Sequence, residues 1–173
     1  IANTGSHLFD LIRLFFGEII SLKSTLSKNN SNNIMDPNFN ITLELSNEIS
    51  CNIIALNYKN YGLLEMDIIG TTGRIKLNLA SDQIEYFKID NTDSIVYKKL
   101  SKSKITLKNS KQSSIQLGIK NLIEAIQTNK QLQCTGFDGY KSLELIIASI
   151  NSAKNGKKIK LPLTNKNYNI DSK

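Results

Sequence analysis

The sequence predicts an α+β domain: an open, mainly antiparallel β-sheet with helices packed on one face. Three features predict it. Strand-like segments follow one another through the middle of the chain, short polar turns separate them, and helical patterns stand at both ends. Strands joined by short turns pair antiparallel, whereas parallel strands need long crossovers. We place the domain at residues 1–163, long enough to bury a sizeable core, and a polar C-terminal tail at 164–173.

The first expected elements are a helix over residues 6–16 and a strand over 18–26. Gly17 is a stop signal between them. The apolar stripe that should face the core recurs at helical spacing and consists of Leu8, Leu11, Ile12 and Phe15. A polar loop over 29–38 follows.

Further strands continue the predicted sheet. Apolar residues alternate with polar ones over 39–45, 49–55, 66–68, 75–79, 84–86 and 95–97. Gly70 and Gly73 bracket a tight turn between two of these strands, where we expect positive φ. Because this turn opens no helix, its amides form no phosphate cradle.

Two helices and a short strand are expected to complete the domain. Apolar stripes predict the helices over 115–126 and 143–150. Gly156 stops the second helix, and residues 158–161 form the last strand.

The second face of the sheet is expected to be partly apolar. Ile54 and Leu56 point opposite to Ile53 and Ala55 in the alternating pattern. An apolar second face favours a partner, so we expect a homodimer or homotetramer through the sheet face.

The net charge of +7 does not indicate a nucleic-acid partner. Only Arg13 and Arg74 are arginines among 22 scattered basic residues, and arginine is the residue best shaped to bind phosphates and guanines. Four tyrosines are expected to pack across strands rather than stack on bases: Tyr58, Tyr61, Tyr86 and Tyr97. No apolar segment reaches the ~20 residues of a membrane span. We therefore expect neither a nucleic-acid nor a membrane partner.

The two cysteines, Cys51 and Cys134, form no CxxC motif. With a single histidine there is no zinc-ligand spacing, so we expect no metal. Cys51 lies in an alternating strand pattern that is typical of a buried reduced thiol, which favours a cytoplasmic location.

His7, the only histidine, is the candidate for proton-transfer chemistry. It lies at the margin of the apolar stripe, near a helix start whose dipole disfavours an imidazolium. Asp10, one turn later, either orients the imidazole or only complements the helix dipole. The residues alone leave open that His7 is structural or merely exposed.

Three segments resemble a known family. Residues 3–19, NTGSHLFDLIRLFFGEI, resemble the start of the C-terminal domain of Gfo/Idh/MocA oxidoreductases, the glucose–fructose oxidoreductase, inositol dehydrogenase and rhizopine-catabolism family. Residues 69–77 resemble its glycine-bracketed turn between strands, and residues 135–162 its final helix and strand.

This resemblance implies the C-terminal substrate-binding and oligomerisation domain of an NAD(P)-dependent oxidoreductase, with a dihydrodipicolinate-reductase-like fold. Its Rossmann domain, which would hold most of the NAD or NADP site, is expected upstream of Ile1, since the chain opens without a methionine. The family's lysine, within Glu-Lys-Pro, has no counterpart in this sequence. We therefore expect the chain alone to be inactive.

The resemblance also assigns roles to residues. His7 is the implied general acid/base for hydride transfer between a sugar-type hydroxyl and nicotinamide, Asn3 and Thr4 are implied substrate contacts, and Asp10 supports His7. Many members carry Asp where this chain has Asn3, and some members that act on nucleotide-linked sugars carry Asn. We therefore favour a nucleotide-linked sugar. The alternative is a non-catalytic dimerisation or binding domain with the same fold and a degenerate site.

Overall fold

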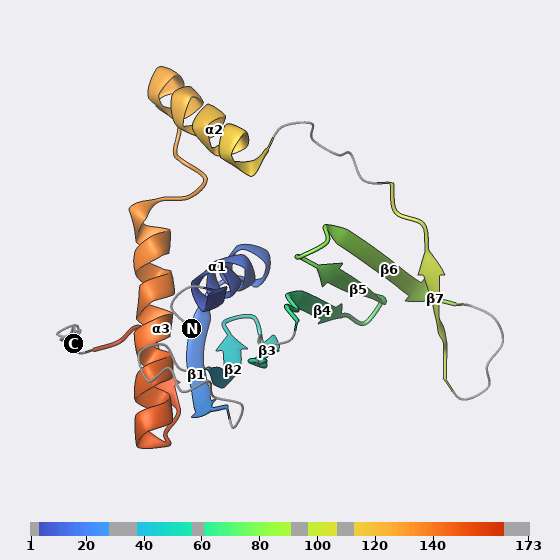
Figure 1. Cartoon of the computed structure of the whole chain (residues 1–173), viewed down its shortest axis with the longest axis horizontal. Coiled ribbons are helices and arrows are strands. Elements are labelled where there is room, and N and C mark those ends of the chain that lie inside the picture. The colour runs from blue at the N-terminus through green and yellow to red at the C-terminus, as the bar shows by residue number, and fades with distance from the viewer. Residues whose placement is uncertain (1–3, 28–37, 57–60, 91–96, 107–112, 165–173) are drawn as a thin grey trace. The chain divides into compact units, whose positions relative to one another are not determined.

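The computed structural model describes residues 4–27, 38–56, 61–90, 97–106 and 113–164 (Figure 1). The chain divides into two compact units. The first contains Ile1–Asn57 and Asn121–Lys173, and the second contains Tyr58–Lys120.

A four-stranded antiparallel sheet forms the centre of the first unit, with strand order β3-β2-β1-β8. The strands are β1 (Ile19–Leu26), β2 (Phe39–Leu45), β3 (Ser50–Ile53) and β8 (Ile159–Lys160). β2 alternates buried and exposed residues without a break, as its sequence pattern predicts. Its inward side chains, together with Ile19 and Leu22 of β1, make the sheet's half of the core.

Two helices, α1 (Thr4–Phe16) and α3 (Gly136–Asn155), supply the other half of this core. α3 packs on β1, and α1 packs on α3 (Figure 1). α3 begins seven residues before the predicted start at 143 because Thr135 and Asp138 form a capping box that initiates the helix there. Gly156, at φ 66°, ends it in the left-handed conformation.

Serines line the contact between α3 and β1. The backbone N–H of Ser24 donates to Ser152 Oγ at 2.9 Å, and the Ser24 hydroxyl donates to the carbonyl of Ser149. All three residues are buried. Because their side chains are small, the helix lies close to the strand, and the hydroxyl of Ser152 satisfies an N–H of a strand edge that the short β8 does not reach.

The second unit is another four-stranded antiparallel sheet, in the order β4-β5-β6-β7. Its strands are β4 (Glu65–Ile69), β5 (Gly73–Asn78), β6 (Gln83–Ile89) and β7 (Leu100–Ser103). The predicted fold class is therefore confirmed, but the strands divide between two sheets instead of forming one meander. β3 is an edge strand of the first sheet and β4 an edge strand of the second.

Two details of this second sheet correct the sequence-based predictions. The predicted strand over 95–97 is wrong at Tyr97, which is 80% exposed and lies outside β7. A hydrogen bond from Asp90 N–H to the carbonyl of Lys99 sets the start of β7 later in the chain. Gly73 is needed for close approach and not for positive φ, since a Cβ there would lie 2.4 Å from the carbonyl oxygen of Phe87.

The helix predicted over 115–126 is α2 (Ser114–Thr128). Its apolar stripe is exposed along its length, with exposed fractions between 47% and 74% for Ile115, Ile119, Leu122, Ile123 and Ile126. Within the described residues, no helix is long and apolar enough to cross a membrane.

Both cysteines are free thiols. Cys51 is half-buried, where its strand pattern predicts a buried thiol, and this partial burial raises the pKa of the thiol. Cys134 is exposed.

Candidate functional site

α1 carries the candidate site on the side turned away from the core. Its buried residues are Gly5, Phe9 and Ile12, which recur at helical spacing. The predicted core stripe is wrong at Phe15, whose side chain is 52% exposed. Apolar residues surround most of this helix, so the sequence period permits more than one stripe, and packing against α3 selects the one through Phe9.

His7 and Thr4 are both exposed on α1. They lie three residues apart in the helix, so their side chains are neighbours on its surface. The structure therefore brings together two of the predicted site residues. Asn3, the third predicted contact, lies outside the described residues.

Asp10 follows His7 by one further turn, with its side chain 47% exposed. Its Oδ1 lies 4.0 Å from an amino nitrogen of Arg13, the next residue along the same helix surface. Asp10 thus lies one turn from His7 and one turn from Arg13 on the same helix. Its supporting role for His7 stays a prediction.

Arg13 is a residue that the sequence reasoning did not single out. Its side chain is only 8% exposed. The guanidinium donates to both carboxylate oxygens of Glu18, with the shortest contact 2.7 Å from NH2 to Oε1. This hydrogen bonding raises the pKa of Arg13 above its usual value, so the side chain is a permanent cation. The sequence offered one signal for Arg13: it is the only arginine of a mostly apolar helix.

The same guanidinium faces the start of α3. Arg13 NH2 lies 3.6 Å from Oδ1 of Asp138. The other oxygen, Oδ2, accepts from the backbone N–H and the hydroxyl of Thr135 at 2.8 and 2.9 Å. These bonds from Thr135, with a smaller contribution from Arg13, lower the pKa of Asp138. One carboxylate thus both caps α3 and receives the cation of α1.

Glu144 lies on the adjacent turns of α3 and is 4% exposed. It is fully satisfied: Lys141 Nζ lies 3.2 Å from Oε2, and the backbone N–H of Leu163 donates to Oε1 at 2.9 Å. A hollow bounded by Arg13, Glu18, Lys141 and Glu144, among others, has a volume of about 10 Å³. That is the space of about one water molecule, so this charged cluster holds the fold and not a ligand.

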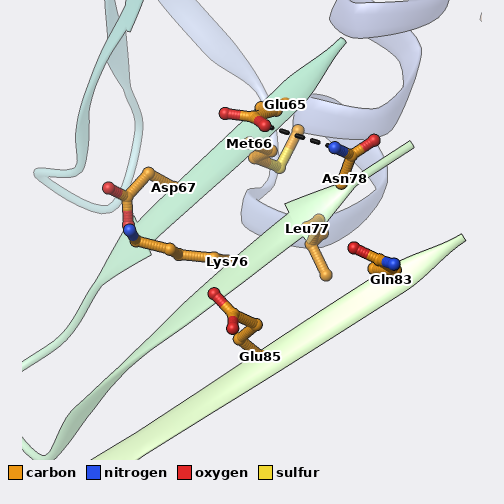
Figure 2. A pocket seen from close by; sticks show the side chains of 8 residues that line it. All are labelled: Glu65, Met66, Asp67, Lys76, Leu77, Asn78, Gln83 and Glu85. Carbon is orange, nitrogen blue, oxygen red and sulfur yellow. Dashed lines mark hydrogen bonds between the residues drawn. The ribbon is translucent and has the colours of Figure 1, made fainter. Parts of the chain in front are cut away.

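A larger hollow, of about 210 Å³, lies on the polar face of the second unit's sheet (Figure 2). Its lining comes from β4, β5 and β6 and consists of Glu65, Met66, Asp67, Lys76, Leu77, Asn78, Gln83 and Glu85.

The carboxylates of this hollow already have partners. Asn78 donates to Glu65 at 3.2 Å, as Figure 2 shows. Asp67 accepts from Arg74, and Glu85 accepts from Lys102. Within the described part of the chain, no group of three or more His, Cys, Asp or Glu side chains is placed to hold a metal ion. The hollow is therefore a paired polar surface.

Solved structures of several oxidoreductases share this fold. The WlbA dehydrogenase from Bordetella pertussis, solved with NADH and UDP-GlcNAcA, matches 93% of this chain with 21% identity and a TM-score of 0.66. Levoglucosan dehydrogenase, solved with NADH, matches 92% with 15% identity and a TM-score of 0.68. An aldose-aldose oxidoreductase from Caulobacter crescentus, complexed with glycerol, matches 91% with 16% identity and a TM-score of 0.71.

The chain spans 44%, 49% and 46% of these three structures, about half of each. At these identities the likeness establishes the fold, which is that of the C-terminal alpha/beta domain of oxidoreductases. No curated protein matches the sequence.

The sequence itself matches the C-terminal alpha/beta domain of the oxidoreductase family over residues 1–161. The chain therefore belongs to the Gfo/Idh/MocA oxidoreductase family, as its sequence motifs predict.

Proposed function

We propose that this chain is the substrate-binding and oligomerisation domain of an NAD(P)-dependent oxidoreductase. In this proposal, hydride passes between the carbon of a sugar-type hydroxyl and nicotinamide, and His7 is the general acid/base. The observation that carries the proposal is the placement of His7: an exposed imidazole on the outer surface of a helix whose opposite face is buried in the core.

His7 supplies the proton-transfer half of the reaction. An imidazole nitrogen accepts the proton of the substrate hydroxyl while the carbon that carries this hydroxyl loses its hydrogen as hydride. In the reverse reaction the imidazole returns the proton to the oxygen. Thr4, one turn away, offers a hydroxyl to a neighbouring group of the sugar, and the amide of Asn3 both donates and accepts hydrogen bonds. Asp10 supports the imidazole from its other side.

The nicotinamide cofactor, when bound, supplies the hydride acceptor. The Gly70–Gly73 turn does not fit its phosphates, because this turn joins β4 to β5 and opens no helix. We therefore place the NAD or NADP site in a Rossmann domain outside this sequence. The chain's own part is to hold the sugar and to move the proton.

A nucleotide-linked sugar is our preferred substrate. Support comes from Asn3 and from the similarity to the WlbA dehydrogenase, whose structure carries NADH and UDP-GlcNAcA. Support for a sugar more generally comes from levoglucosan dehydrogenase, which was also solved with NADH and levoglucosan. A cytoplasmic location fits the free thiols of Cys51 and Cys134.

For the oligomer, we propose a homodimer or homotetramer through the sheet face. The exposed fractions of Ile20 (46%) and Ile54 (71%) support an apolar contribution to this contact. Sedimentation of the whole protein tests it, and a monomer at micromolar concentration would contradict it.

A substrate panel tests the proposed reaction. The whole protein is mixed with NAD or NADP and with one of three compounds: a UDP-linked sugar acid, a free aldose or a cyclitol. We expect the reduced nicotinamide to accumulate with the UDP-linked compound. Cofactor binding without turnover on any compound would instead support the non-catalytic alternative with a degenerate site.

A further inference from the structure

Arg13 connects three separate pieces of the first unit. It lies near the end of α1, its side chain is 8% exposed, and its guanidinium reaches Glu18, which precedes β1. The same group reaches Asp138 at 3.6 Å, in the first turn of α3. No other side chain of α1 has ion pairs to both neighbours of this helix among the described residues.

The contacts of Arg13 restrain α1 in a way that its apolar contacts do not. Phe9 and Ile12 are buried and hold the helix against the core. Burial of apolar surface is non-directional, so it selects the buried face of the helix but sets its exact rotation less sharply than directional bonds do. Charged hydrogen bonds from a planar guanidinium are directional, and the fork onto Glu18 engages both carboxylate oxygens.

The restraint has a consequence for His7, six residues earlier on the same helix. A side chain on an α-helix reaches ~5–6 Å from the helix axis, so a rotation of about 10° moves its tip by about 1 Å. A displacement of about 1 Å is enough to cost on the order of 100-fold in rate when a reacting group must be in place. If His7 transfers the proton, the rotation of α1 must therefore be fixed.

Arg13 also forms a long ion pair with Asp10, which lies one turn from both His7 and Arg13 on the helix surface. The Oδ1 of Asp10 is 4.0 Å from the guanidinium.

We propose that Arg13 is the positioning residue of the His7 helix, fixing the rotation of α1 through Glu18 and Asp138. The proposal rests on the proposed function of His7. In this proposal Arg13 does not contact the substrate. It acts by fixing the orientation of the helix that carries His7.

The test uses the whole protein, with histidine labelled at Cε1 with ¹³C and the His7 resonance assigned by its loss in His7→Gln. Arg13→Met keeps the length of the side chain and removes the charge and the fork. We expect the His7 resonance to shift or broaden and kcat to fall about 10- to 100-fold. The affinity for the cofactor should stay within about twofold, whereas the KM for the sugar should rise, because Thr4 lies on the same helix and moves with it. Arg13→Lys should recover part of both effects, because it restores the charge without the fork.

Arg74→Met is the matched control. Arg74 is the other arginine of the chain, and it makes a similar pair with Asp67 in the second unit. We expect it to leave the His7 resonance and kcat unchanged. A folded Arg13→Met protein with the wild-type resonance and wild-type kcat would overturn the proposal.

Two further variants keep the test decisive if Arg13→Met does not fold. Glu18→Gln and Asp138→Asn each remove one partner's charge at nearly constant size, and each should move the His7 resonance in the same direction by a smaller amount. No movement in either would overturn the proposal. If His7→Gln turns out to be fully active, the proposed function fails, while the resonance still reports whether Arg13 positions this helix.

Discussion

Phe9 and Phe15 of α1 distinguish the observed packing of this helix from the packing that its apolar period predicts. Phe9 is fully buried, and Phe15 is 52% exposed. Replacing a buried phenylalanine by alanine removes its transfer free energy and leaves a cavity, at a cost of ~3–5 kcal/mol in the free energy of unfolding. For a half-exposed phenylalanine there is little cavity term, and the cost is about 1 kcal/mol.

Denaturant unfolding of Phe9→Ala and Phe15→Ala, followed by far-UV circular dichroism, measures this difference. Phe9→Leu supplements the pair if Phe9→Ala is too unstable to purify, with an expected cost of about 1 kcal/mol or more. Equal costs, or a larger cost at Phe15, would refute the observed face of α1. They would also place the stripe through Leu8, Leu11 and Phe15 against the core. The position of His7 on the outer surface of α1 would then be wrong as well.

Three other predictions concern stability. Gly73→Ala should cost ~1–3 kcal/mol, because the new Cβ would meet the carbonyl of Phe87 at 2.4 Å and force the strands apart; chemical denaturation measures it, and a neutral result would contradict the close approach. Thr135→Ala should cost ~0.5–2 kcal/mol through loss of the α3 cap, whereas Thr135→Ser should cost little; a similar cost for both would contradict the capping role. Acid should destabilise the fold, because the pKa values of Asp138 and Asp67 are lowered below the ordinary 3.8 by Thr135 and Arg74 respectively. Their contribution is fully present above that value and is lost as pH falls through the lower folded-state values, so the free energy of unfolding should decline below about pH 4; a level profile down to about pH 3 would contradict it.

The sequence predicted those parts of the fold that depend on local patterns. Strict alternation placed β2 correctly, and Gly17, at φ 90°, ended α1 where the sequence indicates. The start of α3 was harder to predict from the sequence. The capping box at Thr135 precedes the regular apolar stripe of α3, which starts at Leu143, so apolar periodicity alone begins the helix too late.

Long-range pairing explains what the sequence could not predict. Alternation marks a strand but does not say which strand it pairs with, so the division at β3 and β4 into two sheets was not visible. Gly73 was recognised as constrained, but the reason lies in β6, whose Phe87 carbonyl occupies the space of a side chain.

The candidate site shows the same limit. His7 was found because it is the only histidine and belongs to a recognisable motif. Arg13 was missed because its meaning depends on Asp138, 125 positions later, which only the packing of α3 on α1 brings within reach.

The central claim, that His7 transfers the proton, is tested most directly by the turnover of the whole protein carrying His7→Gln, with the substrate that the panel identifies. A positioned general acid/base contributes about 10²- to 10⁴-fold in rate. We expect kcat to fall by that factor while cofactor affinity, measured by titration, stays unchanged. A His7→Gln protein that binds cofactor and turns over at the wild-type rate would contradict the account.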